Sequence, residues 1–175
     1  MEFRELTMAD CEQVRRWRNQ CLYALRTPFM LTQEMQEDFH KNTVCNRNAR
    51  ARFCGIWIKD KVSSTFIGMC GLENIEWENS CAEISIILNP EWPGRRYGSK
   101  VIAMLFEKGF NHLGLKTIYG ECYEINPSIG FWKDIIEKYK ADTARLPNRK
   151  LWNGNYYDSL YFSIDRSDYF ESNNT

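Results

Sequence analysis

Apolar residues along the chain recur either at every second position, as in a strand, or at every third or fourth position, as in a helix. The stretch where the first spacing changes to the second is the most informative part of the sequence. Residues 81–88 (CAEISIIL) alternate as a half-buried strand does, and a short loop of Pro, Gly and Arg then leads into a helical spacing. A helix is predicted over 99–113 and a strand over 117–123. The apolar face of that helix comprises Val101, Ile102, Leu105, Phe106 and Phe110. This order predicts a β-α-β unit with a ligand site at the carboxyl end of its first strand.

The same two spacings divide the rest of the chain into short strands and helices. Strands are predicted over 3–6, 52–58, 65–75, 149–152 and 156–164, and helices over 9–25, 32–41 and from Asn126 through Tyr139. The turn Asn153-Gly154 joins the last two strands into a hairpin. The resulting order is β, α, α, β, β, β, α, β, α, β, β. One domain is expected over 1–166, followed by a polar, disordered tail over 167–175.

Composition narrows the class of protein. The chain has 175 residues, enough for the core of one domain, and its 43% hydrophobic and 14% aromatic content excludes a disordered protein. No apolar run approaches the roughly 18 residues that a membrane span needs, and the charged N-terminus does not resemble a secretory signal. These features predict a cytoplasmic protein without a membrane partner.

Charge and cysteine usage exclude further classes. Lys plus Arg and Asp plus Glu each total 23, so no global positive field gathers nucleic acid, and none is expected as a partner. The seven cysteines are odd in number and lack a CxxC pair, which argues against a disulfide framework and against structural zinc. With only two histidines in the chain, no metal site is expected.

The loop before the central helix has the composition of an anion-binding turn. Free N–H groups at the start of a helix point at whatever precedes it, and glycines allow close backbone approach while arginines add positive charge. The predicted phosphate-binding residues are Gly94, Arg95, Arg96, Tyr97, Gly98 and Ser99. Short Gly/Arg loops are also common before helices that bind nothing, and the loop matches neither a P-loop nor a dinucleotide fingerprint. On these residues alone, both interpretations stay open.

Four segments, taken with the element order, resemble the GNAT superfamily of N-acetyltransferases over nearly the whole chain. They read FRELTMADCEQVRRWRN, FIGMCGLENIEW, AEISIILNPEWPGRRYGS and NGNYYDSLYFSI. In detail they look like the branch of ribosomal-protein N-terminal and amino-sugar-nucleotide acetyltransferases. The resemblance implies an α+β domain with a mixed, mostly antiparallel sheet of about seven strands, about four helices, and parallel fourth and fifth strands that splay apart. The loop departs from the family pattern, because Pro93 and Arg96 replace its first basic residue and first glycine.

The resemblance also implies the cosubstrate and where it binds. Acetyl-coenzyme A would lie where the fourth and fifth strands diverge, with its pyrophosphate on the loop. A backbone N–H near Ile87 or Leu88, freed by a bulge, would hold the thioester oxygen, with Ile86 beside it. Asn126 and Ser128 resemble the residues at the start of the family's next helix that contact the thiol. Ser128 is equally suited to be only a helix cap.

For the chemistry, the resemblance implies direct attack of a primary amine on the thioester in a ternary complex. A carboxylate would accept the amine's proton, and Glu73 ranks first, with Glu76, Glu83 and water as alternatives. Tyr123, with Tyr139 as a second choice, would protonate the thiolate, because Phe131 and Trp132 stand where the family often has a tyrosine.

The element Trp17-Arg18-Asn19 resembles one that lies near the acceptor in this branch, although Trp17 fits a core position equally well. The acceptor is expected to be a small amine, an amino sugar or a peptide N-terminus. Several arginines in the flanking segments suggest an anionic group on it: Arg47, Arg50, Arg52, Arg145 and Arg149. Two rivals remain: a non-catalytic sensing or interaction module that has lost acetyl-coenzyme A turnover, and a generic nucleotide binder. The protein is expected to be a monomer or a homodimer.

Overall fold

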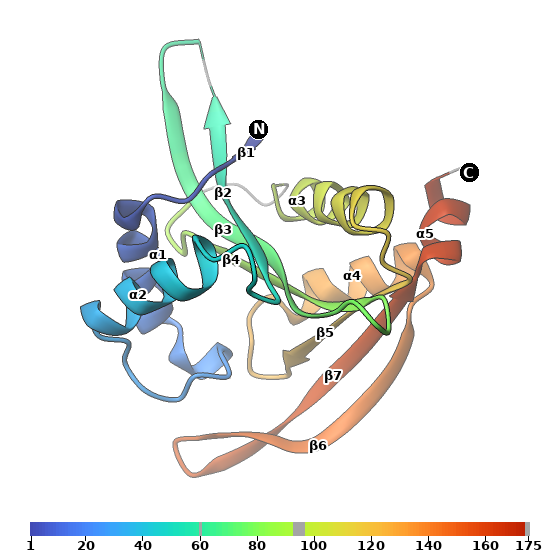
Figure 1. Cartoon of the computed structure of the whole chain (residues 1–175). Helices are drawn as coiled ribbons and strands as arrows, with labels where there is room; N and C mark the ends of the chain where they lie inside the picture. Colours follow the sequence, from blue (N-terminus) through green and yellow to red (C-terminus); the bar gives the residue numbers. More distant parts are fainter. Residues whose placement is uncertain (60, 93–96, 174–175) are drawn as a thin grey trace.

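The structure is a computed structural model that describes residues 1–59, 61–92 and 97–173. Its strands form one seven-stranded sheet in the order β1-β2-β3-β4-β5-β7-β6 (Figure 1). The strands are β1 (Glu2–Arg4), β2 (Arg52–Lys59), β3 (Ser64–Glu76), β4 (Cys81–Leu88), β5 (Thr117–Tyr123), β6 (Asp142–Trp152) and β7 (Asn155–Asp165). The helices are α1 (Met8–Gln20), α2 (Gln33–Phe39), α3 (Tyr97–Phe106), α4 (Ile129–Tyr139) and α5 (Arg166–Asn173). The α+β architecture and the seven-stranded sheet confirm the prediction.

Strand pairing is antiparallel everywhere except between β4 and β5. These two parallel strands pair over only three residues, Cys81–Glu83 with Thr117–Tyr119. Beyond them β4 stays paired with β3 as far as Leu88, while β5 stays paired with β7 as far as Tyr123. The predicted divergence of the fourth and fifth strands is therefore confirmed.

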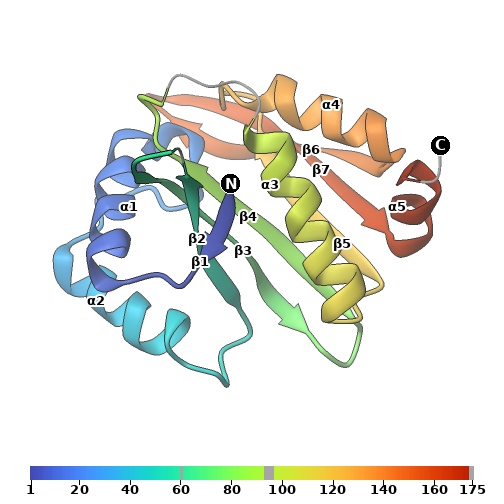
Figure 2. The same ribbon diagram turned by 90° about the horizontal axis from the view of Figure 1, so that it is seen from above.

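Helices cover both faces of the sheet, with α1 and α2 on one face and α3 and α4 on the other (Figures 1 and 2). The larger apolar core lies under α3 and α4, and it takes up the whole predicted apolar face of the central helix. A smaller core under α1 contains Leu6, Cys11, Val14, Trp17 and Met69. Residues along a strand alternate between the faces, so each strand of the sheet contributes to both layers.

The C-terminal segment corrects the predicted disordered tail. Residues 166–173 form α5, which packs Tyr169 against the larger core with only 9% of its surface exposed. The Tyr169 ring lies 5.0 Å from that of Phe110 and 6.1 Å from that of Tyr139, centroid to centroid. One aromatic side chain therefore anchors a helix whose average composition is polar, because aromatic packing supplies much burial from a single residue.

Two element bounds also differ from the prediction. Strand β6 begins at Asp142 rather than at residue 149, its residues 142–146 are already paired with β7, and the pairing shifts between Leu146 and Lys150. A bulged edge strand accommodates a proline, which explains why Pro147 hid the strand in the sequence. Helix α1 ends at Gln20, and a single 3₁₀ turn replaces the predicted helix end near residue 25. The predicted Asn153-Gly154 turn is confirmed, with positive φ at both residues.

Candidate active site

The divergence of β4 and β5 leaves backbone groups of β4 without a neighbouring strand. The N–H of Asn89 donates to the Ile67 carbonyl of β3 at 2.8 Å. Because successive residues of a strand direct their N–H groups to opposite sides, those of Leu88 and Ile86 point toward the side that β5 has left. The predicted position at Ile87 is wrong on this geometry, since its N–H faces β3. The predicted bulge is also absent from 84–88, where the register with β3 is regular.

The start of α3 lies on the same face as the side chains of Ile86 and Leu88. Tyr97 and Leu88 are partly buried against the larger core, and Ser99 is exposed. A Cβ on Gly98 would lie 3.0 Å from a ring carbon of Phe131, so α3 and α4 meet closely at this point. The predicted binding residues Gly94, Arg95 and Arg96, together with Pro93, lie outside the described residues.

The opposite face of β3 and β4 carries paired polar groups. Glu73 of β3 stands directly across from Glu83 of β4, and Ser85 donates a hydrogen bond to the Glu73 carboxylate. Burial raises the pKa of Glu73, and the nearby Glu83 charge adds to that effect, whereas Ser85, Arg18 and Arg26 work against it. A carboxyl group with a raised pKa in a half-buried position suits proton transfer near neutral pH.

Arg26 lies between the two diverging strands and binds a carboxylate of each. Its guanidinium donates two hydrogen bonds to Glu83, one of them at 2.9 Å, and forms a 3.4 Å ion pair with Glu121 of β5. Asn74 donates to Glu83 as well, also at 2.9 Å. Glu83 is 7% exposed at its side chain and Arg26 is 50% exposed. No sequence pattern indicated Arg26, because it stands alone in an irregular segment, far in sequence from both partners.

Glu121 is the second carboxylate that Arg26 contacts, and it has further partners of its own. Burial opposes its charge, but hydrogen bonds from Arg149 at 3.0 Å and from the Ser159 hydroxyl at 2.6 Å outweigh burial and lower the pKa of Glu121. Glu121 is therefore charged near neutral pH and held by β7 and β6, and its lowered pKa makes it a weaker proton acceptor than Glu73.

Tyr123 ends β5 beside the same cluster. It is 8% exposed, and burial together with the Glu121 charge raises the pKa of its hydroxyl, although Arg26 donates a hydrogen bond to it. The Lys150 Nζ lies 5.6 Å from the centre of its ring. A buried, protonated phenol at this edge of the sheet can donate a proton. Tyr139, the predicted alternative, lies in the larger core with 1% of its surface exposed and away from these groups.

The remaining predicted residues at the helix after β5 lie at the surface. Asn126 accepts a hydrogen bond from the Ser128 N–H at 2.9 Å, and its amide reaches the Ala24 carbonyl at 3.5 Å. Ser128 is exposed and precedes α4 without a side-chain capping hydrogen bond. Its hydroxyl thus stands open to a ligand at the α4 N-terminus.

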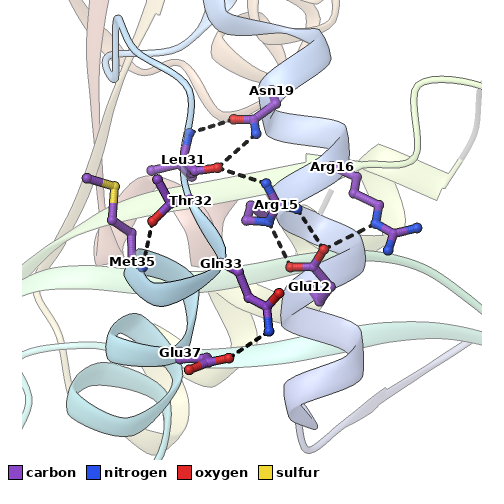
Figure 3. A network of polar contacts seen from close by, with 9 residues as sticks. All are labelled: Glu12, Arg15, Arg16, Asn19, Leu31, Thr32, Gln33, Met35 and Glu37. Carbon is purple, nitrogen blue, oxygen red and sulfur yellow. Dashed lines mark hydrogen bonds and ion pairs between the residues drawn. The ribbon is translucent and has the colours of Figure 1, made fainter.

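The three residues of the Trp17-Arg18-Asn19 element separate in the structure. Trp17 is a core residue that stacks on Phe66 with ring centroids 5.5 Å apart. Asn19 exchanges two hydrogen bonds with the Leu31 backbone, at 2.8 and 3.0 Å, and Arg15 donates to the same carbonyl (Figure 3). Only Arg18 faces the polar cluster, and it donates to the Thr27 hydroxyl at 3.2 Å.

These contacts fix the segment between α1 and α2 that carries Arg26. Asn19 and Arg15 hold its far end at Leu31, and the Lys150 ammonium donates to the carbonyls of Leu22 and Leu25 at its near end. Lys150 is 4% exposed, and burial lowers its pKa. The segment is therefore held from both sides against the face on which Glu73 lies.

Four of the five arginines that suggested an anionic substrate group from the sequence have protein partners instead, and Arg149 is one of them through Glu121. Arg50 pairs with Glu78, and Arg145 pairs with Asp158 at 2.7 Å. Arg52 donates to backbone carbonyls of residues 47, 49 and 51. Among the described residues, no group of three or more His, Cys, Asp or Glu side chains is placed to hold a metal ion. No helix in the described part of the chain is long and apolar enough to cross a membrane.

Comparison with known proteins identifies one matching family model and several solved structures with a similar fold. A family model described as an acetyltransferase (GNAT) domain matches residues 1–130. A mutant form of the spermidine N-acetyltransferase of Vibrio cholerae is 20% identical, with a TM-score of 0.77 and 99% of both chains covered. The same organism's spermidine N-acetyltransferase in complex with CoA and spermine is 20% identical, with a TM-score of 0.81 and 97% of both chains covered. At this level of identity the two structures share the fold of this chain.

Proposed function

This chain belongs to the acetyltransferase (GNAT) domain family, and we propose that it transfers the acetyl group by direct attack of a primary amine within a ternary complex. As a family member it is an acetyl-CoA-dependent N-acetyltransferase. One observation carries the proposed mechanism: where β4 and β5 diverge, β4 has N–H groups that face away from β3, and the half-buried Glu73 carboxyl group lies on β3, three residues along the ladder from the partner of Ile86.

The cosubstrate would lie along the open edge of β4. The N–H groups of Leu88 and Ile86 point where the thioester oxygen needs a donor, and they would stabilise the negative charge that develops there on attack. The pyrophosphate would bind at the first turn of α3, which comprises Tyr97, Gly98 and Ser99 and where N–H groups have no carbonyl partner within the helix. Ser128, exposed at the start of α4, would contact the thiol.

Glu73 and Tyr123, on the α1 and α2 face of the sheet, would accept and supply the protons that the reaction transfers. The amine nitrogen bonds to the thioester carbon, the bond from that carbon to sulfur breaks, and the amine's proton passes to Glu73. The thiolate that leaves takes a proton from Tyr123, whose raised pKa keeps it protonated until then. The raised pKa of Glu73 in turn brings its proton affinity closer to that of the attacking amine.

The direct test measures thiol release from acetyl-CoA with a panel of primary amines, for the native chain and for Glu73→Gln. We expect Glu73→Gln to lower kcat/KM by roughly a hundred- to ten-thousand-fold, the usual contribution of a general base. Calorimetric affinity for acetyl-CoA should stay unchanged, because Glu73 lies on the amine's face. Binding without any thiol release from the native chain contradicts the proposal and favours the non-catalytic alternative.

A matched variant, Glu76→Gln, separates the two candidate bases on β3. Glu76 accepts a hydrogen bond from Asn79 at the turn that follows and is exposed to solvent on one side, so we expect native activity. The pH profile adds a second readout. Activity should fall as the pH drops through the raised pKa of Glu73, above the usual glutamate value of about 4.3, and Glu73→Gln should lack this limb. If the native chain and Glu73→Gln show the same pH profile of activity, a group other than Glu73 is the base.

A further inference from the structure

The face of the sheet that carries Glu73 also carries an unusual concentration of positive charge. Around the divergence of β4 and β5, four cations, Arg18, Arg26, Arg149 and Lys150, accompany three carboxylates among the described residues. The carboxylates are Glu73, Glu83 and Glu121. Which of these charges are already paired decides what kind of amine this face can accept.

Two of the three carboxylates are fully engaged. Arg26 and Asn74 bind Glu83, and Arg149 and Ser159 bind Glu121, which Arg26 also contacts. Charge-assisted hydrogen bonds of this kind are strong, and Glu83 and Glu121 are both nearly buried. A second ammonium group of a polyamine would have to displace a guanidinium to reach either one. The site therefore offers a polycation little attraction beyond its reacting amine.

Two of the four cations lack a carboxylate hydrogen-bond partner among the described residues. Lys150 donates to backbone carbonyls. Arg18 donates to the neutral Thr27 hydroxyl, and its Nε is buried without a hydrogen-bond partner in the described part of the chain. A buried donor without a partner is costly unless a ligand satisfies it.

Arg18 also lines a cavity of about 110 Å³ between α1, α2 and β3. The other lining residues are Leu31, Met35, Gln36, Phe39 and Met69. At about 30 Å³ for each water, this volume holds a few atoms, which suits one carboxylate or phosphate group with part of a carbon chain. Met69, which lines this cavity with Arg18, lies on the same face of β3 as Glu73, and the Arg18 charge acts on the Glu73 carboxyl group.

We propose that the acceptor is an amine that carries its own negative group, a carboxylate or a phosphate, which Arg18 binds while Arg26 neutralises Glu83 and Glu121 and so disfavours polyamines. This inference rests on the proposed function, since it names the class of amine that Glu73 deprotonates. It separates this chain from the spermidine N-acetyltransferases whose fold it shares. Arg18 is a substrate-binding residue on this view, and Arg26 is a specificity-determining residue.

The test compares four primary amines: β-alanine with a carboxylate, O-phosphoethanolamine with a phosphate, propylamine with no further charge, and spermidine. We expect kcat/KM to be highest for one of the two anionic amines, and which one leads identifies the group. Arg18→Gln should lower kcat/KM for that amine by about ten- to a hundredfold, the usual value of a hydrogen bond to a charged group, and should lower it less for propylamine, which is affected only through the lost charge near Glu73. Arg16→Gln is the matched control, since Arg16 is an exposed neighbour paired with Glu12.

Arg26→Gln gives an independent readout, because it leaves Glu83 and Glu121 with one fewer cation. Spermidine turnover relative to propylamine should rise by about tenfold or more if Arg26 excludes polyamines. Calorimetry with acetyl-CoA confirms that each variant is folded. A preference of the native chain for spermidine or propylamine, or an equal loss for all amines in Arg18→Gln, overturns the inference and leaves the acetyl transfer standing. No transfer to any of the four amines overturns the proposed function itself.

Discussion

The two faces of the sheet around β4 and β5 differ in what holds them together. On the α3 and α4 face, strands and helices meet through apolar side chains, and Ile84, Ile102 and Phe106 are buried in one continuous core. On the α1 and α2 face, β3, β4 and β5 present Glu73, Glu83 and Glu121, and arginines from distant segments bind the last two. Stability should therefore depend mainly on the first face, and acceptor chemistry on the second.

This difference follows from the alternation of a strand. Residues 83, 85 and 87 point to one face and 84, 86 and 88 to the other, so one segment supplies both a core and a reactive surface. A substitution on one face is expected to leave the function of the other largely intact. Three variants test that separation.

Phe106→Ala should have the largest effect on the apolar face. Phe106 is fully buried among Phe110, Tyr139 and Tyr169, and removing such a ring costs about 3–5 kcal/mol of the free energy of unfolding. Urea denaturation followed by fluorescence or circular dichroism measures the loss. Phe29→Ala is the control, because 53% of Phe29 is exposed, and it should change the free energy little. Equal losses in the two variants contradict the assignment of the core.

Gly98→Val should have an intermediate effect, confined to the cosubstrate. The added side chain would press on the Phe131 ring, which a Cβ alone would approach to 3.0 Å, and shift the start of α3. Such overpacking costs about 1–3 kcal/mol of stability, and because relieving it moves the first turn of α3, we expect acetyl-CoA affinity to fall by about tenfold. Calorimetry measures it.

Gly130→Ala provides the comparison for that variant, since nothing lies within 4 Å of a Cβ at Gly130, one helix away. It should bind acetyl-CoA as the native chain does. Unchanged affinity in Gly98→Val as well shows that the first turn of α3 does not hold the pyrophosphate.

Arg149→Met should have the smallest effect and should alter the pH dependence of stability. Arg149 lowers the pKa of Glu121, so the pair stabilises the fold above the usual glutamate pKa, and this contribution is lost as the pH falls through the lowered value. The melting temperature of Arg149→Met should lie slightly below the native one at neutral pH, and the two should converge in acid. A constant difference at all pH values assigns the effect to packing instead of charge.

The sequence predicted the apolar face well, because hydrophobic spacing reports burial directly. Val101, Ile102, Leu105, Phe106 and Phe110 are all buried, and the diverging strands lie where the resemblance placed them. Alternation alone could not choose between Ile87 and Leu88 for the open N–H, since that depends on which edge pairs with β3. Which side of β4 pairs with β3 is determined only when the whole sheet assembles.

No local sequence pattern predicted the network of charged residues on the α1 and α2 face. Arg26 meets Glu83 and Glu121, and Lys150 meets Leu22 and Leu25, across more than fifty residues of chain in each case. Such contacts depend on tertiary packing and follow no period. Trp17-Arg18-Asn19 shows the same limit, because three adjacent residues take a core, a cavity-lining and a backbone-binding position.

The three-residue pairing of β4 with β5 also has a mechanical meaning. It divides the sheet into β1–β4 and β5–β7, and one half follows the N-terminus while the other leads to the C-terminal helix. A force applied between the two ends of the chain therefore loads this seam, where few slanted hydrogen bonds resist separation. The molecule should give way first along this seam, where we propose that the cosubstrate binds.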